Sequence, residues 1–312
     1  MSQMISYSQN GEDVILRRIF GDKKDGFYID IGASHPEFLS VTKHFYDQGW
    51  CGLNVDPLKK SITLFTKDRP RDLNLNLAID CENGSREFFE ITDYPELSTF
   101  SAEAAANLSV GGYNVISYPV NTITGDKLFS EYVRYPVDFM KIDVEGRENE
   151  VIRSIDFYRY RPKVLVIEAT IPNSPFPGWH DLKSIFSFEK WESMLLGSGY
   201  ILAYFDGLNR FYVSEESRQF LDCFQVGLCI WDDYVIHPQV KRIAELEWHC
   251  ARREEQIESL TAVLKESESD RAARLEQIHE LTRLLKESES DRAARGDQIQ
   301  TLTAMLKQSG GR

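Results

Sequence analysis

The sequence contains no long apolar run. No stretch approaches the roughly 18–20 consecutive apolar residues that a helix needs to span a bilayer. The opening residues, MSQMISYSQNGED, have neither the basic start nor the apolar core of a secretory signal. These absences predict a cytoplasmic protein without a membrane span.

Cysteine and positive charge are also sparse. The five cysteines, at positions 51, 81, 223, 229 and 250, form no short disulfide framework and have no zinc-site spacing, so we expect free thiols. Lys and Arg number 36 against 49 Asp and Glu, which gives a formal net charge of −13. Because nucleic-acid phosphates are bound by clustered Lys and Arg, this balance argues against a nucleic-acid partner.

Proline is absent after about Lys241, and there the sequence repeats itself. Residues 256–276 recur as 277–297 with 15 of 21 positions identical, and a third, partial copy begins at Gln298. The period equals three heptads, with Ile257 at position a and Leu260 at position d, and later a and d positions alternate between apolar residues and Ser or Arg. The pattern predicts a domain at 1–240 and a coiled-coil tail at 241–312 that forms a homo-oligomer. A solvated, partly frayed helix is the alternative.

Short apolar segments alternate with helical ones in residues 1–240. The segments expected to form strands are 27–32, 51–56, 73–78, 138–143 and 163–168. The helices expected between them are 9–20, 37–48, 57–68, 124–133, 147–157 and 180–197. This alternation predicts an α/β fold with a mostly parallel sheet, and segments 200–205 and 210–214 predict an antiparallel hairpin at its edge. Segments 87–91 and 114–120 fit the alternation less well and are candidates for extra strands.

The ends of the first two strands carry a candidate ligand site, because open α/β sheets bind ligands where the strand order reverses. The first strand runs into Asp30-Ile31-Gly32-Ala33-Ser34-His35-Pro36, whose small residues let a ligand approach the backbone. This is not a GxGxxG turn, and Asp30 suits a cationic ligand better than an anion. Asp56 ends the next strand, where it can bind both hydroxyls of a ribose or cap the helix that Pro57 opens.

The combination of segments resembles one family. FkbM-type S-adenosylmethionine-dependent methyltransferases contain segments similar, in the same order, to GFYIDIGASHPEFLSVTKHFYDQGWCGLNVDP, NLAID, LSTF, VDFMKIDVEGRENEVIRSI and PKVLVIEA, and the resemblance covers about residues 6–215. It implies a class I methyltransferase (Rossmann-like) fold, S-adenosyl-L-methionine as cofactor, and O-methylation of a hydroxyl, often on a sugar. The residues that the resemblance assigns to cofactor binding are Asp30, Gly32, Ala33, Ser34, Asp56, Pro57, Ala78, Ile79 and Asp80.

Three acids at later strand ends are candidates for the chemistry. Methyl transfer to an alcohol needs an aligned acceptor oxygen and assistance in removing the hydroxyl proton. Asp143 and Glu145 lie in KIDVEG, and Glu168 lies in VIEA. Asp143 and Glu145 project on the same side of an extended chain, where repulsion raises one pKa towards that of a useful base. A base or positioning role, Mg²⁺ ligation and capping of the helix after Gly146 all stay open.

Several further polar residues have a functional and a structural interpretation. His35 adjoins the expected cofactor turn as a candidate base or acceptor-binding group, although a packed role is commoner for a histidine beside proline. Lys141 lies in an apolar strand, where an amine usually needs a carboxylate partner, so we expect a buried ion pair. Gln9 and Ser98 reach the pocket or cap local turns.

The loop PNSPFPG precedes Trp179 and His180, and these residues are candidates for a lid that binds the acceptor. The sequence thus predicts an S-adenosylmethionine-dependent O-methyltransferase that acts on a hydroxyl of a carbohydrate or glycan precursor. A nicotinamide-dependent sugar-modifying enzyme is one alternative, since it would also use Asp56 on a ribose. A catalytically inactive scaffold that anchors the repeat tail is another.

Overall fold

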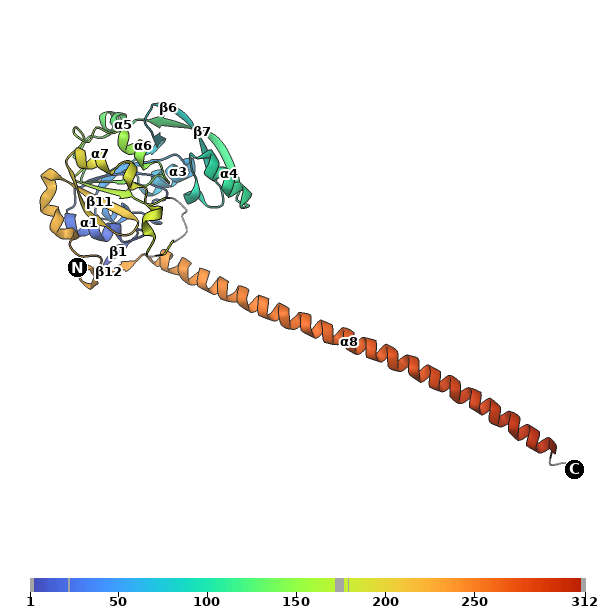
Figure 1. Cartoon of the computed structure of the whole chain (residues 1–312). Coiled ribbons are helices and arrows are strands. Elements are labelled where there is room, and N and C mark those ends of the chain that lie inside the picture. The colour runs from blue at the N-terminus through green and yellow to red at the C-terminus, as the bar shows by residue number, and fades with distance from the viewer. Residues whose placement is uncertain (1–2, 22, 172–176, 179, 310–312) are drawn as a thin grey trace. The chain divides into compact units, whose positions relative to one another are not determined.

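A computed structural model describes residues 3–21, 23–171, 177–178 and 180–309 (Figure 1). The chain divides into two compact units, Met1–Lys241 and Arg242–Arg312. Within the described ranges, no helix combines the length and the apolar character needed to cross a lipid bilayer.

The first unit alternates strands and helices along the chain. Its strands are β1 (Met4–Ser6), β2 (Phe27–Ile31), β3 (Cys51–Asp56), β4 (Leu73–Asn76), β5 (Ala78–Ile79), β6 (Gly84–Ile91), β7 (Val115–Ile123), β8 (Phe139–Ile142), β9 (Val164–Glu168), β10 (Tyr200–Phe205), β11 (Asn209–Ser214) and β12 (Tyr234–Ile236). Its helices are α1 (Glu12–Phe20), α2 (Lys43–Asp47), α3 (Lys59–Asp68), α4 (Ala102–Val110), α5 (Gly125–Tyr132), α6 (Glu148–Arg153) and α7 (Glu192–Gly197). Short 3-10 helices are η1 (Pro95–Leu97), η2 (Leu182–Ile185), η3 (Phe188–Lys190), η4 (Glu215–Phe224) and η5 (Ile230–Asp232).

The main sheet is mostly parallel. Seven strands of the described chain form it, in the order β10-β11-β9-β8-β2-β3-β4. β11 pairs antiparallel with both β9 and β10, whereas the pairs among β9, β8, β2, β3 and β4 are parallel. The predicted α/β fold with an antiparallel edge hairpin is confirmed. β2 lies between β8 and β3, so the strand order reverses beside β2, which is where a ligand site is expected.

A second, smaller sheet lies beside β3, next to the carboxyl ends of the central strands. In the described residues it has the order β5-β7-β6, and it contains both of the extra strands that the sequence suggested. The expectation of one strand over 73–78 is wrong, because the chain leaves the main sheet at Asn76 and Ala78 pairs with Thr122 in β7. This crossing places β5 and β6 near the carboxyl end of the main sheet, over the expected site.

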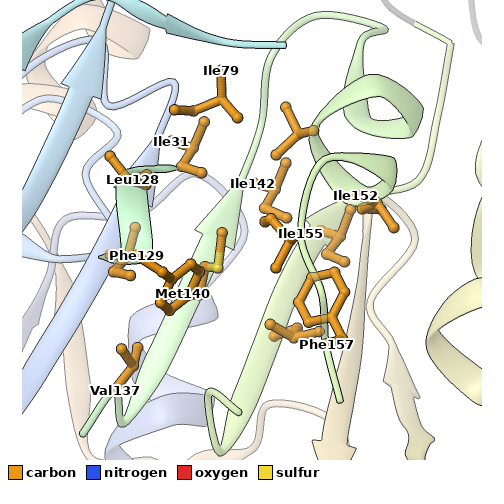
Figure 2. Close-up of a cluster of buried hydrophobic side chains, with 14 of the residues drawn as sticks. Ile31, Ile79, Leu128, Phe129, Val137, Met140, Ile142, Ile152, Ile155 and Phe157 are labelled. Atoms are coloured by element: carbon orange, nitrogen blue, oxygen red, sulfur yellow. The ribbon is translucent and has the colours of Figure 1, made fainter. Parts of the chain in front are cut away.

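Successive side chains of the central strands point to opposite faces of the sheet, and each face packs in its own core layer. Ile31, Met140 and Ile142 face one layer, where they pack with residues of α5 and α6 (Figure 2). Tyr28 and Phe139 face the opposite layer, with residues of α1 and α2. Burial on both faces explains why these strands read as short, continuous apolar runs.

Several helices are shorter than the sequence patterns suggested. A helix over 37–48 was expected, but α2 spans only Lys43–Asp47, because Leu39 adopts a left-handed φ of 51°. The expected helix over 180–197 is replaced by η2, η3 and α7. Pro57 does not open a helix, since α3 begins at Lys59 with Leu58 as its N-cap. β1 and β12 form a parallel pair that the sequence analysis did not anticipate.

Most of the second unit is formed by α8 (Pro238–Ser309), a continuous helix of 72 residues whose first four residues belong to the first unit (Figure 1). At about 1.5 Å per residue it extends roughly 100 Å. Its described side chains from Arg242 onward are exposed, the apolar ones included. The predicted helix is confirmed, and its pairing in a coiled coil stays a prediction.

Candidate functional site

A pocket opens at the carboxyl ends of β2, β3 and β8, beside the reversal of strand order. The residues predicted from the sequence that line it are Gly32, Ala33, Ser34, Asp56, Pro57, Ala78, Ile79, Asp143 and Glu145. The predicted residues that do not line it are Asp30, His35, Asp80 and Glu168. Residues separated by more than 100 positions in the sequence therefore meet around one cavity.

Gly32 allows the ends of β2 and β8 to meet directly. Its φ is +79°, and a Cβ at this position would lie 1.6 Å from the backbone oxygen of Asp143. The Gly32 amide donates to the Val55 carbonyl at 3.0 Å, and the Asp143 amide donates to the Ile31 carbonyl at 3.0 Å. Glycine is therefore required here by the contact between two strand ends, which was not apparent from the sequence, as well as by its place in the pocket wall.

Asp56 joins the turn after β2 to the segment that precedes α3. Its Oδ2 accepts a hydrogen bond from the Ser34 amide, and its Oδ1 accepts one from the Leu58 amide, both at 2.8 Å. Burial raises the pKa of Asp56 to about 6, although these two hydrogen bonds act to lower it. Each carboxylate oxygen keeps a second lone pair, so Asp56 can still accept a hydrogen bond from a ligand in the pocket.

The expected ion pair of Lys141 is present and involves two acids. Lys141 is the direct neighbour of Asp30 in the β2–β8 register. Its ammonium lies 3.1 Å from the Asp143 carboxylate and 3.6 Å from that of Asp30. Burial by itself lowers the pKa of Lys141, but Asp143 and Asp30 outweigh it and raise the pKa above its ordinary value. Lys141 and Asp143 both line the pocket, so their ion pair sets the charge at this part of the pocket, which we call its floor.

Asp30 acts beneath the pocket, and this corrects the expectation that it lines the site. It is 1% exposed, and one carboxylate oxygen accepts a hydrogen bond from the Thr42 hydroxyl at 3.1 Å. Thr42 in turn accepts a hydrogen bond from Arg69 at 2.7 Å. Burial raises the pKa of Asp30, while Lys141 and Arg69 oppose that shift. Asp30 therefore anchors Lys141 from below.

Carboxyl groups concentrate after β8 and β9. Burial raises the pKa of Glu145 to about 8, and repulsion from Asp143 and Glu148 adds to the effect. Burial also raises the pKa of Glu168 to about 10, with Asp143 and Glu145 contributing. The repulsion predicted from the KIDVEG spacing therefore exists, although desolvation is the larger cause.

In the part of the chain that the structure describes, no group of three or more His, Cys, Asp or Glu side chains is arranged to hold a metal ion.

Glu148 shapes the loop that carries Glu145, and the sequence analysis missed it. Its Oε1 accepts hydrogen bonds at 3.1 Å from the amides of Val144 and Gly146. Glu145 has a left-handed φ of 53°, which the two hydrogen bonds around it help to hold. The signal in the sequence is an acid two residues after Gly146 in VEGRE, at the start of the expected helix over 147–157.

Two of the expected site residues have structural partners instead. The Nδ1 of His35 accepts hydrogen bonds from the amides of Glu37 and Phe38, at 3.1 and 2.9 Å, and burial lowers the pKa of this imidazole. These contacts favour the packed role of His35 over the catalytic one. Asp80 forms ion pairs with Arg86 and, at 3.0 Å, with Arg147, so its carboxylate is held outside the pocket wall.

β6, the segment between β6 and β7, and the N-cap of α3 supply a wall that sequence reasoning did not foresee. Leu58, Phe88 and Phe100 form its apolar part, and the rings of Phe88 and Phe100 lie 4.8 Å apart. Arg147 adds a cation close to Phe100. Gln9 and Ser98, which the sequence suggested as candidates, also line the pocket. The proposed lid falls largely on residues 172–176 and on Trp179, which lie outside the described residues.

Among comparisons with known proteins, one match identifies a family. A model described as "Methyltransferase FkbM domain" matches residues 30–202, which is more than half of the chain. No curated protein matches the sequence. Among solved structures, the chain is similar to a fibrillarin pre-rRNA processing protein from Methanococcus jannaschii, with 12% identity and a TM-score of 0.36 over 66% of this chain and 76% of that one. It is also similar to the cofactor-bound protein Rv0187 from MTB, with 11% identity and a TM-score of 0.31 over 69% and 84%. At such low values neither similarity bears on function.

Proposed function

Because the chain belongs to the FkbM methyltransferase family, we propose that it transfers the methyl group of S-adenosylmethionine to a hydroxyl oxygen of a carbohydrate or glycan precursor. The observation that carries the proposal is the pocket at the reversal of strand order, which is lined by the backbone turn at Gly32 and by acids at the ends of two strands, Asp56 at β3 and Asp143 and Glu145 after β8. The small, acidic and apolar residues that line the pocket support this cofactor over an anionic one.

The pocket residues fit the proposed cofactor in charge and in shape. Asp56, Asp143 and Glu145 place carboxyl groups around a cavity that would hold a positively charged sulfonium. Leu58 and Phe100 offer an apolar wall suited to a planar base. Asp56, with a free lone pair on each oxygen, would accept hydrogen bonds from the ribose hydroxyls.

When bound, S-adenosylmethionine supplies a methyl group that is activated by the positive charge on sulfur. The work left to the protein is alignment of the acceptor oxygen, worth about 7–11 kcal/mol in well-oriented systems, and acceptance of the hydroxyl proton. Glu145 would accept that proton, because its pKa of about 8 lies near working pH. Asp143, tied to Lys141, would orient the acceptor. Glu168 lies outside the pocket wall; with a pKa of about 10, it would stay protonated and donate a hydrogen bond to Asp143.

Two measurements on the full chain test the proposal. Isothermal titration should show binding of S-adenosylmethionine, and tritiated methyl transfer should occur with a nucleotide sugar or a cell-envelope glycan precursor as acceptor. Binding of NAD without binding of S-adenosylmethionine would favour the nicotinamide alternative. Cofactor binding without turnover on any acceptor would favour the inactive scaffold.

The tail has its own proposed role, which is self-association. α8 exposes apolar side chains along its length, including Ile257 at 62% and Leu260 at 69%, and burying them against another helix would be favourable. Truncation after Lys241, the end of the first compact unit, should abolish association and leave cofactor binding and turnover intact. Loss of turnover in a folded truncated protein would contradict this division of labour.

A further inference from the structure

The heptad pattern of α8 continues toward its N-terminal end, before the repeats begin. Counting back by sevens from Ile257 places Cys250 and Ile243 at position a, and counting back from Leu260 places Leu246 at position d. Ile243 and Leu246 are 41% and 48% exposed, and Cys250 is an exposed free thiol. Arg253 occupies the d position between Cys250 and Ile257, so the same mixture of apolar and Arg layers that marks the repeats extends back to Ile243, with Cys250 inside this seam.

The order of the core layers distinguishes the two ways in which two such helices can pair. Each repeat presents the layers Ile, Leu, Leu, Ser, Arg and Arg, as in 257, 260, 264, 267, 271 and 274. A parallel pair in register matches every layer with its own kind. An antiparallel pair that aligns the Arg layers sets Ile against Ser in each repeat, since the order does not read the same backwards. The layers therefore favour a parallel pair.

Charges beside the Arg layers agree with this direction. In a parallel pair, a residue at position a packs against position g of the preceding heptad of the other helix. Arg271 at a would then contact Asp270 of the second copy, and Arg292 would contact Asp291. On the outer face, Arg283 already forms ion pairs with Glu280 and Glu287 of its own helix, at 2.6 and 2.7 Å. Arg271 and Arg292, by contrast, form no ion pair within the described part of their own helix, so a second helix can supply their partners.

The unstaggered register of a parallel pair is favoured because it gives the longest overlap between the two helices. Because the repeats are nearly identical, a stagger of one repeat would still match apolar layers with apolar layers. Such a stagger removes 21 of the 72 residues of α8 from the overlap and places Cys250 opposite Arg271. It also leaves Ile243 and Leu246 of one helix unpaired, so the unstaggered pair buries the most apolar surface.

We propose that α8 pairs in parallel and in register with α8 of a second copy of the chain, which brings the two Cys250 thiols face to face in one core layer. The proposal rests on the self-association proposed above and adds its direction and register. At a facing a layer, the two Cα atoms approach within the range of about 4.4–6.8 Å that a disulfide bridges. Cys250 is therefore a native reporter of the arrangement.

The test uses the full chain in two steps. Light scattering after size exclusion, under reducing conditions, should give about twice the chain mass of 36.0 kDa. Oxidised glutathione is then added: two Cys250 thiols lose two electrons and two protons and form one S–S bond, while the glutathione disulfide is reduced to two thiols. A covalent dimer should appear on a non-reducing gel, and it should be absent from Cys250→Ser and after addition of dithiothreitol.

A pair of introduced cysteines supplies a matched control. In the Cys250→Ser background, Ser267→Cys lies at position d and should cross-link, whereas Ser269→Cys, two residues further at the outer position f, should not. A dimer that cross-links through neither Cys250 nor Ser267→Cys would overturn the parallel in-register arrangement and leave self-association standing. A monomeric mass would overturn both, with methyl transfer judged separately by its own assay.

Discussion

The ammonium nitrogen of Lys141 lies 3.1 Å from the carboxylate of Asp143, at the floor of the pocket. Lys141 is 7% exposed and also faces Asp30, which is 1% exposed and needs a compensating charge. The ammonium of Lys141 therefore neutralises Asp30 inside the sheet and Asp143 in the pocket wall, so the stability of the sheet and the charge of the site depend on the same cation.

Lys141→Met should destabilise the first unit by about 3 kcal/mol, since it leaves a buried carboxylate without its partner. Adding Asp30→Asn should recover part of that loss, because the second change removes the uncompensated charge. Urea unfolding followed by the fluorescence of the buried Trp50 and Trp191 measures both variants. Equal stability of Lys141→Met and the parent chain would show that the ion pair contributes nothing.

Gly32→Ala should damage the fold more than a glycine replacement at an open position. The new Cβ would lie 1.6 Å from the Asp143 oxygen, so the ends of β2 and β8 would have to separate. Gly112→Ala is the matched control, since Gly112 has a φ of +91° but nothing within 4 Å of the added carbon. We expect the control to lose about 1–3 kcal/mol from backbone strain alone and Gly32→Ala to lose clearly more. Similar thermal unfolding of both variants would refute the steric role.

Asp56→Asn should weaken binding of S-adenosylmethionine by about 10- to 100-fold, or roughly 1–3 kcal/mol, if the carboxylate binds the ribose. The affinity of the parent chain should rise as pH passes about 6, because Asp56 then loses its proton. Ser61→Ala is the control, since it removes a hydrogen bond to the carbonyl of Ser34 in the same turn without touching the carboxylate. Isothermal titration decides between the roles, and an unchanged affinity for Asp56→Asn would leave it as a purely structural group.

Glu145→Gln should lower kcat by about 10²- to 10⁴-fold if Glu145 accepts the hydroxyl proton. With a pKa of about 8, Glu145 is mostly protonated at pH 6 and ionised above pH 8, so kcat of the parent chain should rise with pH and level off above about 8. The variant should lose that rise. Glu150→Gln, in the same segment but outside the pocket wall, should keep the parent profile. Methyl-transfer rates from pH 6 to 9 give the comparison, and an unchanged profile in Glu145→Gln would assign the proton to another group.

The sequence was informative where a feature depends on a single segment. Short, nearly continuous apolar runs predicted β2, β3, β8 and β9 within one or two residues, since the strands of a parallel sheet are buried on both faces. The 21-residue repeat predicted the long helix. Helix limits failed where one residue broke the pattern, as Leu39 does before α2 with its left-handed backbone.

Local patterns by themselves determined the class of fold, the strand ends at which a ligand would bind, and the acids that stand there. Only the tertiary structure decided which of those acids face the cavity, because exposure depends on neighbours that are distant in sequence. Asp80 and Glu145 have the same chemistry and similar positions after strands, yet Arg86 and Arg147 hold the first outside the pocket wall, while the loop pinned by Glu148 keeps the second in it. Charge pairing and desolvation act through space, and the chain order does not record them.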